Sequence, residues 1–189
     1  MSKLLPANHE AFRTKAYWDH FFQERDNEAF EWYGSYQDVQ HFIAQHIPDQ
    51  NAPVLTIGCG NSEFSHHMYD SGGYHNIHNL DYSAVVIDEM KAKNTRNKRP
   101  GMFWDLGDMT QMTSYTDGQY AAVCDKGALD ALMSVDSADV RAKAMDMFSE
   151  ITRVLAPGGK YLCITLAEPY IVKELMAYFV DGGVVCDAK

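Results

Sequence analysis

Short apolar runs alternate along the chain with segments whose apolar residues recur at helical spacing. Short continuous apolar runs are typical of strands in parallel sheets, which bury both faces. Helical spacing is clearest after Ser137, a residue suited to cap a helix, and Pro157-Gly158-Gly159 is expected to end that helix. The predicted strands are 54–57, 77–80, 102–106, 120–124 and 161–166, with a sixth candidate at 184–186. The predicted helices are 39–47, 62–70, a helix from 83, 137–156 and 169–179.

This alternation predicts an α/β fold with a Rossmann-like, doubly wound, mostly parallel sheet covered by helices on both faces. Ligands of such sheets bind beyond the carboxyl ends of the strands, where the strand order reverses. The 189 residues suit one ordinary domain. We expect residues 1–16, which are polar, to form a flexible N-terminal arm and residues 17–189 to form a single domain.

Composition and charge exclude several classes of protein. Apolar residues make up 46% of the chain and charged residues 22%, which argues against disorder. The chain has no apolar run of membrane-spanning length and no signal-peptide core at its N-terminus, so we expect a cytoplasmic protein without a membrane partner. The net charge of −10 argues against nucleic-acid binding. The four cysteines and eight histidines show no metal-site spacing, and we predict no metal.

The first predicted strand runs directly into a glycine-containing loop, Gly58-Cys-Gly60-Asn-Ser62-Glu63. Glycines at these places allow a sharp turn and a close approach of the backbone to a ligand, although such a pair also occurs in simple turns. A dinucleotide site would have a third glycine where this chain has Glu63, whose carboxylate would repel a diphosphate. The loop therefore favours a nucleoside ligand without phosphates over NAD.

Polar residues follow the next three strands. Asp81 ends the second strand, where an acid accepts hydrogen bonds from ribose hydroxyls; the alternative is a carboxylate that stabilises the following helix through its dipole. After the third strand, Asp108 can accept from an adenine amino group and Met109 can cover the ring. After the fourth, Lys126 is either a partner for a ligand carboxylate or a solvated lysine.

A site with a glycine turn and two acids, but without a residue that would bind a diphosphate, suits S-adenosylmethionine (SAM) better than NAD. The order of these features is similar to that of class I SAM-dependent methyltransferases. The chain also contains the strings Tyr17-Trp-Asp, Glu31-Trp-Tyr-Gly34, Ile57-Gly-Cys-Gly-Asn-Ser62, Asp81-Tyr-Ser, Asp108-Met-Thr-Gln-Met112, Asp125-Lys-Gly-Ala-Leu-Asp-Ala131 and Tyr161-Leu-Cys-Ile. In these strings the chain, from about residue 17 to residue 180, more closely resembles the methyltransferase-like family that methylates lysines of translation elongation factor 1-alpha.

The resemblance implies a SAM-dependent protein-lysine methyltransferase that releases S-adenosylhomocysteine (SAH). It implies a protein partner with a target lysine, elongation factor 1-alpha, and a seven-stranded sheet of which this chain would lack the last strand. Phe22 stands where the family can have Tyr, and Ala128 replaces a Thr. The implied cofactor-binding residues are Trp18, Phe22, Trp32, Gly58, Gly60, Asp81, Tyr82, Asp108, Met109 and Lys126.

The catalytic residues are not assigned by these patterns. Asp125, Tyr33 and Glu168 are the catalytic candidates, and Asp130 joins them as an acid that could face a cationic substrate. A lysine acceptor must lose its proton before it can accept a methyl group, and nearby acids and aromatics favour that change. Two other hypotheses stay open: a non-catalytic SAM-binding or interaction module, and a small-molecule methyltransferase.

Overall fold

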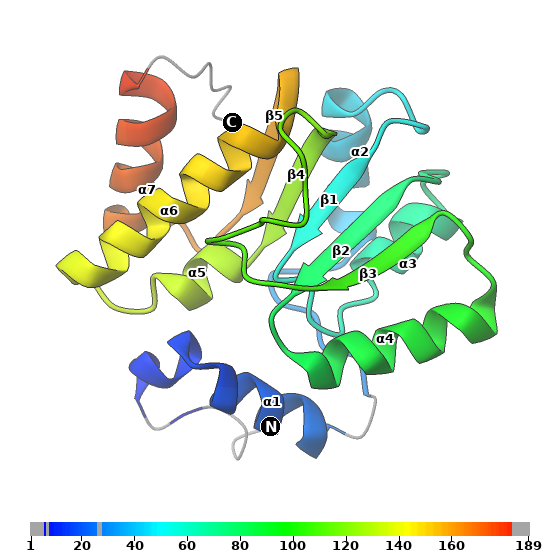
Figure 1. The fold of residues 1–189 in the computed structure, drawn as a ribbon, viewed down its shortest axis with the longest axis horizontal. Helices are drawn as coiled ribbons and strands as arrows, with labels where there is room; N and C mark the ends of the chain where they lie inside the picture. The colour runs from blue at the N-terminus through cyan, green and yellow to red at the C-terminus, as the bar shows by residue number, and fades with distance from the viewer. Residues whose placement is uncertain (1–5, 7, 26–27, 183–189) are drawn as a thin grey trace.

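Five parallel strands form one sheet in the order β3-β2-β1-β4-β5 (Figure 1). The structure, a computed structural model, describes residue 6 and residues 8–25 and 28–182. All four neighbouring pairs are parallel, so the carboxyl ends of the strands meet at one edge of the sheet. The strands are β1 Val54–Ile57, β2 Ile77–Asp81, β3 Met102–Leu106, β4 Tyr120–Lys126 and β5 Leu155–Ile164.

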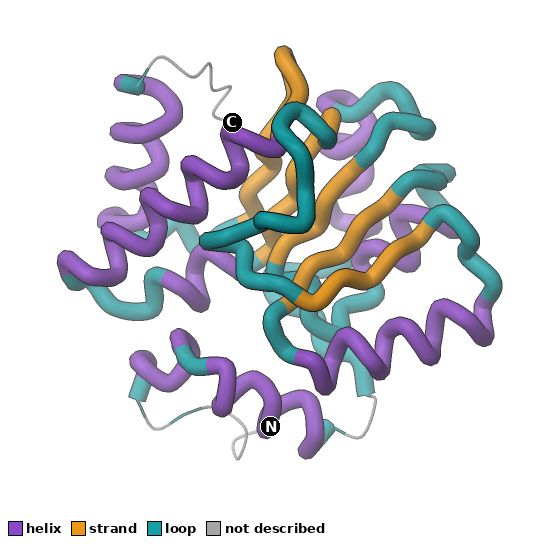
Figure 2. Tube along the Cα trace, viewed as in Figure 1, coloured by secondary structure: helices purple, strands orange, loops and turns teal. Residues whose placement is uncertain are grey.

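Helices cover both faces of this sheet (Figure 2), which confirms the predicted Rossmann-like α/β fold. The order of the strands reverses between β1 and β4, and the edge beside this point is where ligands of such sheets bind. The helical elements are η1 His9–Arg13, α1 Lys15–Glu24, α2 Tyr36–His46, α3 Phe64–Asp70, α4 Ala84–Asn97, α5 Ala128–Leu132, α6 Ala138–Val154, α7 Pro169–Met176 and η2 Ala177–Asp181.

Alternation along the strands divides the core into two clusters. Val54 of β1 packs in a cluster with buried side chains of α1, α2, α3 and α4. Its neighbours Leu55 and Ile57 pack in the other cluster, with α6 and α7. Successive side chains of a strand point to opposite faces, so a strand buried on both faces is mostly apolar, and β1 has one polar residue, the buried Thr56. This requirement explains why the sequence pattern identified the strand so well.

The boundary between α6 and β5 differs from the prediction. The helix ends at Val154 and the strand begins at Leu155, so Pro157-Gly158-Gly159 lies inside the strand rather than at the end of the helix. A proline has no N–H for a strand ladder, and Gly158 has a φ of +77°. The ladder adapts through a register shift between Tyr120 and Ala122.

The two ends of the chain bear on the predicted domain boundaries. Within the segment predicted as an arm, η1 forms a single 3-10 turn, and its Arg13 makes an ion pair with Asp139 of α6. The sixth strand candidate at 184–186 lies outside the described residues. The prediction that the sheet lacks its last strand stays a prediction, since residues 183–189 also lie outside the described part of the chain.

Candidate active site

The loop after β1 turns through two glycines whose φ angles are both +53°, in the left-handed region. A Cβ placed on Gly58 would lie 2.4 Å from the Cβ of Ala128, because the first turn of α5 packs directly against the loop. At Gly60 the nearest side chain is the ring of Phe22, 3.5 Å from such a Cβ. The glycines therefore permit both the turn and the close approach of α5.

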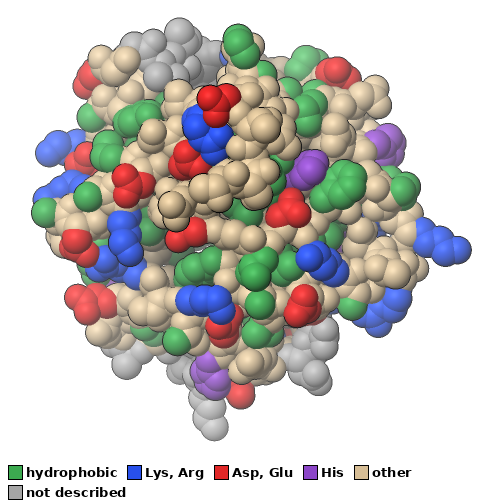
Figure 3. Space-filling model, in the orientation of Figure 1, with side chains coloured by type: hydrophobic (Ala, Val, Ile, Leu, Met, Phe, Trp, Pro, Cys, Tyr) green, Lys and Arg blue, Asp and Glu red, His purple; other side chains and the backbone are tan. Residues whose placement is uncertain are grey.

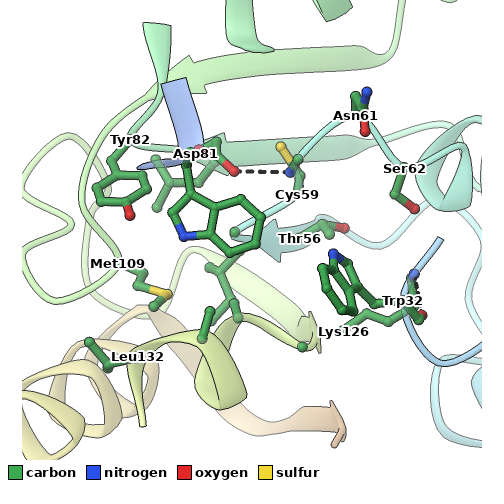
Figure 4. A pocket seen from close by; sticks show the side chains of 18 of the residues that line it. Trp32, Thr56, Cys59, Asn61, Ser62, Asp81, Tyr82, Met109, Lys126 and Leu132 are labelled. Atoms are coloured by element: carbon green, nitrogen blue, oxygen red, sulfur yellow. Dashed lines mark hydrogen bonds between the residues drawn. The ribbon is translucent and has the colours of Figure 1, made fainter. Parts of the chain in front are cut away.

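Asp81, at the end of β2, connects this loop by hydrogen bonds to the start of α4. Its Oδ2 accepts a hydrogen bond from the backbone N–H of Gly60 at 2.9 Å, the dashed line at Asp81 in Figure 4. Its Oδ1 accepts one from the N–H of Ser83, also at 2.9 Å. The side chain is buried, and this burial raises the pKa of the carboxyl to about 6. Both readings of Asp81 are thus compatible: it bonds to the N-cap residue of α4 and also lines the cavity described next.

A cavity lies at the carboxyl edge of the sheet, beside the reversal of strand order. All ten residues that the sequence assigned to cofactor binding line it. Figure 4 shows Tyr82, Met109 and Leu132 along one side, with Trp32 and Lys126 across from them. We call this space the first cavity. The structure brings the predicted residues together, and their contact with a cofactor stays a prediction.

Aromatic side chains from the start of the chain cover the first cavity. The ring of Trp18 is stacked on Phe22 at 5.9 Å between centroids and meets Trp32 edge to face at 6.4 Å. The Nε1 of Trp18 donates to the carbonyl of Phe12, and Phe12 also lines the cavity. The sequence analysis missed Phe12 because it lies in the segment expected to be a flexible arm.

Glu31 fills the position at the start of α3 where a dinucleotide would place its pyrophosphate. Its Oε1 accepts from the backbone N–H of Glu63 at 2.7 Å, and its Oε2 accepts from Ser62 Oγ at 2.8 Å. The same Oε2 also takes a hydrogen bond from Lys126 Nζ at 2.8 Å. The chain therefore supplies its own anion at this helix end. Glu31 belongs to the motif Glu31-Trp-Tyr-Gly34, but no sequence pattern predicts this role.

The side chains of Glu63 and Lys126 have other partners than the sequence predicted. The Glu63 carboxylate contacts His66 Nδ1 at 2.6 Å, which lowers the pKa of Glu63, and it does not line the first cavity. The negative charge at the loop comes from Glu31 instead. Lys126 does line the cavity, but its ammonium already donates to Glu31 and, at 2.8 Å, to the carbonyl of Trp32. Lys126 thus fixes the aromatic segment to the end of β4.

A second cavity adjoins the first and shares part of its wall. Phe12, Trp18, Trp32, Gly127 and Ala131 line both. The residues that line only the second cavity are His9, Tyr33, Asp130, Ser134, Leu166, Glu168, Tyr170 and Ile171. Three of the four substrate-side candidates, Tyr33, Asp130 and Glu168, are therefore together in one place.

The groups of the second cavity differ in their charge state. Burial, followed by the nearby carboxylates of Asp130 and Asp125, raises the pKa of Tyr33, which keeps its hydroxyl neutral at physiological pH. Tyr33 also has a φ of +60°, an uncommon backbone conformation for a large side chain. Burial also raises the pKa of Asp130, although its hydrogen bond from Thr165 acts in the opposite direction.

Asp125 is not part of either cavity, which corrects its placement as a substrate-facing residue. Its side chain is 0% exposed and points toward α5 and β5. It accepts from the N–H of Ala128 at 2.8 Å and from the hydroxyl of Tyr161 at 2.9 Å. Burial raises its pKa to about 6. Asp125 thus caps α5, a helix that the sequence analysis did not predict.

The described part of the chain has neither a metal-binding cluster nor a helix that could span a membrane. Residue 6 and residues 8–25 and 28–182 contain no group of three or more His, Cys, Asp or Glu side chains that could hold a metal ion. Among the same residues, no helix has the length and apolar character needed to cross a bilayer. On the face shown in Figure 3, acidic and basic side chains are interspersed.

A parallel sheet in this order, with a glycine turn after β1 and a buried acid at the end of β2, defines a Rossmann-like domain. Residues 54–159 match the family model described as a methyltransferase domain, and the chain belongs to this family. The solved structures similar to it share the class I methyltransferase fold. One is a putative SAM-dependent methyltransferase from Methanococcus maripaludis, at 16% identity and a TM-score of 0.56, over 95% of this chain and 76% of that one.

Two other similar proteins carry informative descriptions. The eEF1A lysine and N-terminal methyltransferase of Mus musculus is 43% identical over 95% of this chain. The chain spans about a quarter of the length of that relative, 25%. The glycopeptide N-methyltransferase MtfA, solved in complex with sinefungin, has 19% identity and a TM-score of 0.53, over 71% of this chain and 55% of that one.

Proposed function

We propose that this chain is the catalytic domain of a SAM-dependent protein-lysine methyltransferase. The observation that carries the proposal is the pair of adjoining cavities at the carboxyl edge of the sheet, which share an aromatic wall. One has the glycine turn and buried acid that suit a nucleoside, and the other has carboxylates that suit a cationic amine. A methyltransferase needs two such sites side by side, because the donor and the acceptor must meet.

The residues of the first cavity fit SAM. The Asp81 carboxylate is held by the N–H groups of Gly60 and Ser83, so it is fixed in place to accept from ribose hydroxyls. Asp108 and Met109 line the cavity at positions suited to an adenine. Glu31 occupies the site of a pyrophosphate, which disfavours NAD. The MtfA complex supports this assignment, since sinefungin is a nucleoside analogue of SAM.

When bound, SAM supplies a methyl group on a sulfonium; the amine nitrogen forms a bond to that carbon as the carbon–sulfur bond breaks, leaving neutral SAH. The amine must first release a proton to solvent or to a nearby base, because an ammonium has no free electron pair. The aromatic walls exclude water around the acceptor, and partial desolvation lowers the pKa of an amine. The hydroxyl of Tyr33 stays neutral, so its oxygen can accept a hydrogen bond from the amine without forming an ion pair with it.

The proposed substrate is a lysine of elongation factor 1-alpha. The support is the description of the mouse relative, together with that of the Homo sapiens relative, which is 42% identical over 95% of this chain. We further propose a cytoplasmic location, where this abundant translation factor is found. Both statements concern a chain that matches a quarter of these relatives, so they require a test with the chain itself.

The test is a methyl-transfer assay with labelled SAM, the purified chain and purified elongation factor 1-alpha, followed by mapping of the labelled residue. We expect label on a lysine side chain with the wild-type chain and none with the Asp81→Asn variant. Label only in the low-mass fraction of a lysate would support a small-molecule methyltransferase instead. SAM binding without any transfer, to the factor or to a lysate, would support a non-catalytic module and contradict the proposal.

A further inference from the structure

Two polar atoms of the second cavity are buried without a hydrogen-bond partner in the described part of the chain: Asp130 Oδ2 and Ser134 Oγ. The other oxygen of the same carboxylate, Asp130 Oδ1, accepts from Thr165 Oγ1 at 2.8 Å and from the N–H of Leu166 at 3.1 Å. The carboxylate is thus held in one orientation, with one oxygen bonded and one unused. Buried polar atoms are nearly always hydrogen-bonded, so such an oxygen in a cavity indicates a missing donor.

The charged residues that line the second cavity favour a ligand with a positive charge. Asp130 and Glu168 contribute carboxylates, and no Lys or Arg is among the described residues that line it. Glu168 is exposed at the start of α7, whereas Asp130 is partly buried within α5. An incoming cation therefore meets one carboxylate near the solvent and a second one deeper inside. An anionic ligand would be repelled by both.

The walls of the second cavity are aromatic. Rings of Phe12, Trp18, Trp32, Tyr33 and Tyr170 line it, and the hydroxyl of Tyr170 is fixed by its bond to the carbonyl of Met133 at 2.8 Å. Aromatic faces pack against an alkyl chain and also attract an ammonium group. The cavity thus offers apolar surface for a stem and carboxylate oxygen for a charged end.

We propose that the second cavity binds a primary alkylammonium, the chemical form of a lysine side chain, and that Asp130 Oδ2 and Ser134 Oγ accept its N–H hydrogens. The inference rests on the proposed function and deepens it: Asp130 is the residue that selects a cationic amine as acceptor. The shared wall formed by Trp18 and Trp32 then places the bound amine beside the first cavity. Glu168 attracts the cation at the entrance.

The experiment measures amine binding directly, without methyl transfer. n-Butylammonium chloride is titrated into the SAH-saturated chain at constant ionic strength, and the fluorescence of Trp18 and Trp32 reports binding. 1-Butanol serves as the uncharged analogue of the same length. We expect saturable quenching at millimolar butylammonium for the wild type and a much weaker response to 1-butanol. Asp130→Asn should weaken butylammonium binding at least tenfold, and Ser134→Ala about threefold.

The controls separate a lost site from a damaged fold. Asp130→Asn keeps an oxygen for Thr165 and Leu166, so its melting temperature and SAH affinity should match the wild type. Asp88→Asn removes one negative charge from an exposed position on α4 that lines neither cavity, and it should bind butylammonium like the wild type. If Asp130→Asn does not fold, Ser134→Ala and Glu168→Gln still provide the comparison.

The outcomes of this experiment differ from those that would contradict the proposed function. Equal affinity of the wild type and Asp130→Asn for butylammonium would overturn the inference, as would a wild type that binds neither probe or binds 1-butanol equally well. Butylammonium binding that depends on Asp130, without methyl transfer to any protein, would leave the amine site in place and refute the methyltransferase proposal instead.

Discussion

The ends of β2 and β4 provide a direct comparison, because each carries a buried aspartate whose pKa is raised to about 6 by burial. Both carboxylates accept hydrogen bonds from backbone N–H groups that follow in the chain, Asp81 from Ser83 and Asp125 from Ala128. Yet Asp81 lines the first cavity, whereas Asp125 lines neither cavity and contacts Tyr161 of β5. The same residue type at the same edge thus lines a cavity in one place and stabilises the fold in the other.

The difference arises from the side to which each residue points. Successive residues of a strand face opposite sides, and at the end of β4 the residue that lines the first cavity is Lys126, the neighbour of Asp125. An acid at the carboxyl end of a strand therefore identifies a binding residue only when its direction is known.

Replacing Asp125 should have the largest effect, and it should act on stability. Asp125→Ala leaves the N–H groups of Ala128 and Leu129 and the hydroxyl of Tyr161 without their acceptor. We expect a loss of about 4 kcal/mol in the free energy of unfolding, because each buried unpaired group costs about 1–3 kcal/mol. Denaturant titration measures this loss, and a loss below about 1 kcal/mol would show that Asp125 is not the cap of α5.

Replacing Asp81 should instead act on the ligand. Asp81→Asn removes the charge that would accept from both ribose hydroxyls, and we expect SAM affinity to fall about 100-fold, equivalent to about 2.7 kcal/mol. Calorimetric titration with SAM measures the change. Asp125→Asn is the matched control, since it alters an equally buried acid outside the cavity, and its SAM affinity should stay within a few-fold of the wild type.

The pKa of Asp81 predicts a pH dependence of SAM binding. Ribose hydroxyls donate to the ionised carboxylate, so protons compete with the ligand below the free-state pKa of about 6. We expect affinity to be constant above that pH and to weaken by up to about tenfold per pH unit below it. Titrations at several pH values should show this bend for the wild type, and Asp81→Asn should show none. A wild-type affinity independent of pH across this window would contradict the assignment.

The free energy of unfolding should depend on pH through the same two aspartates, Asp81 and Asp125. Their folded-state pKa of about 6 lies above 3.8, the ordinary pKa of an aspartate in an unfolded chain. Each therefore contributes stability below pH 3.8 that is lost as the pH rises through 6, an effect that opposes the usual acid denaturation. Replacing both by Asn should remove this contribution from the pH profile of unfolding.

The smallest predicted effect concerns the link between the end of β4 and the aromatic cover. Glu31→Gln keeps an oxygen for the N–H of Glu63 but removes the ionic partner of Lys126. We expect SAM affinity to fall about fivefold, or about 1 kcal/mol, because Trp32 is less firmly held. Glu28→Gln, which changes an exposed partner of Arg25 in the same segment, is the control and should have no effect.

The sequence predicted the fold well because the signals for it are local. An apolar run such as 54–57 must be buried on both faces, and a glycine turn follows it directly. The five-residue helix α5 gave no comparable signal, since a single turn shows no period. The start of β5 was misplaced because Pro157-Gly158-Gly159 is typical of a helix end, and only the structure shows that β4 pairs with Leu155 before these residues and with Lys160 after them.

The candidate site was predictable only as far as strand ends determine it. The ten cofactor residues follow from the positions of strands, loops and family motifs, and they line one cavity. The direction of Asp125, the role of Glu31 and the contribution of Phe12 depend on contacts between segments far apart in the chain. The sequence identified Asp130 as a candidate acid. Only the structure shows that its Oδ2 has no hydrogen-bond partner among the described residues, while Thr165 and Leu166 donate to its Oδ1.

The aromatic cover has a consequence for how the protein is made. Arg13 pairs with Asp139, 126 residues further along, and the two cavities are completed by Lys143 and Glu168. During vectorial synthesis, Trp18 and Phe22 emerge from the ribosome before Phe64 of α3 and Val86 of α4, which belong to the same apolar cluster. Sequence-distant contacts of this kind form slowly and leave apolar side chains exposed in the interval. Nascent chains that stop short of α6 should therefore be clients of chaperones and unable to retain a nucleoside.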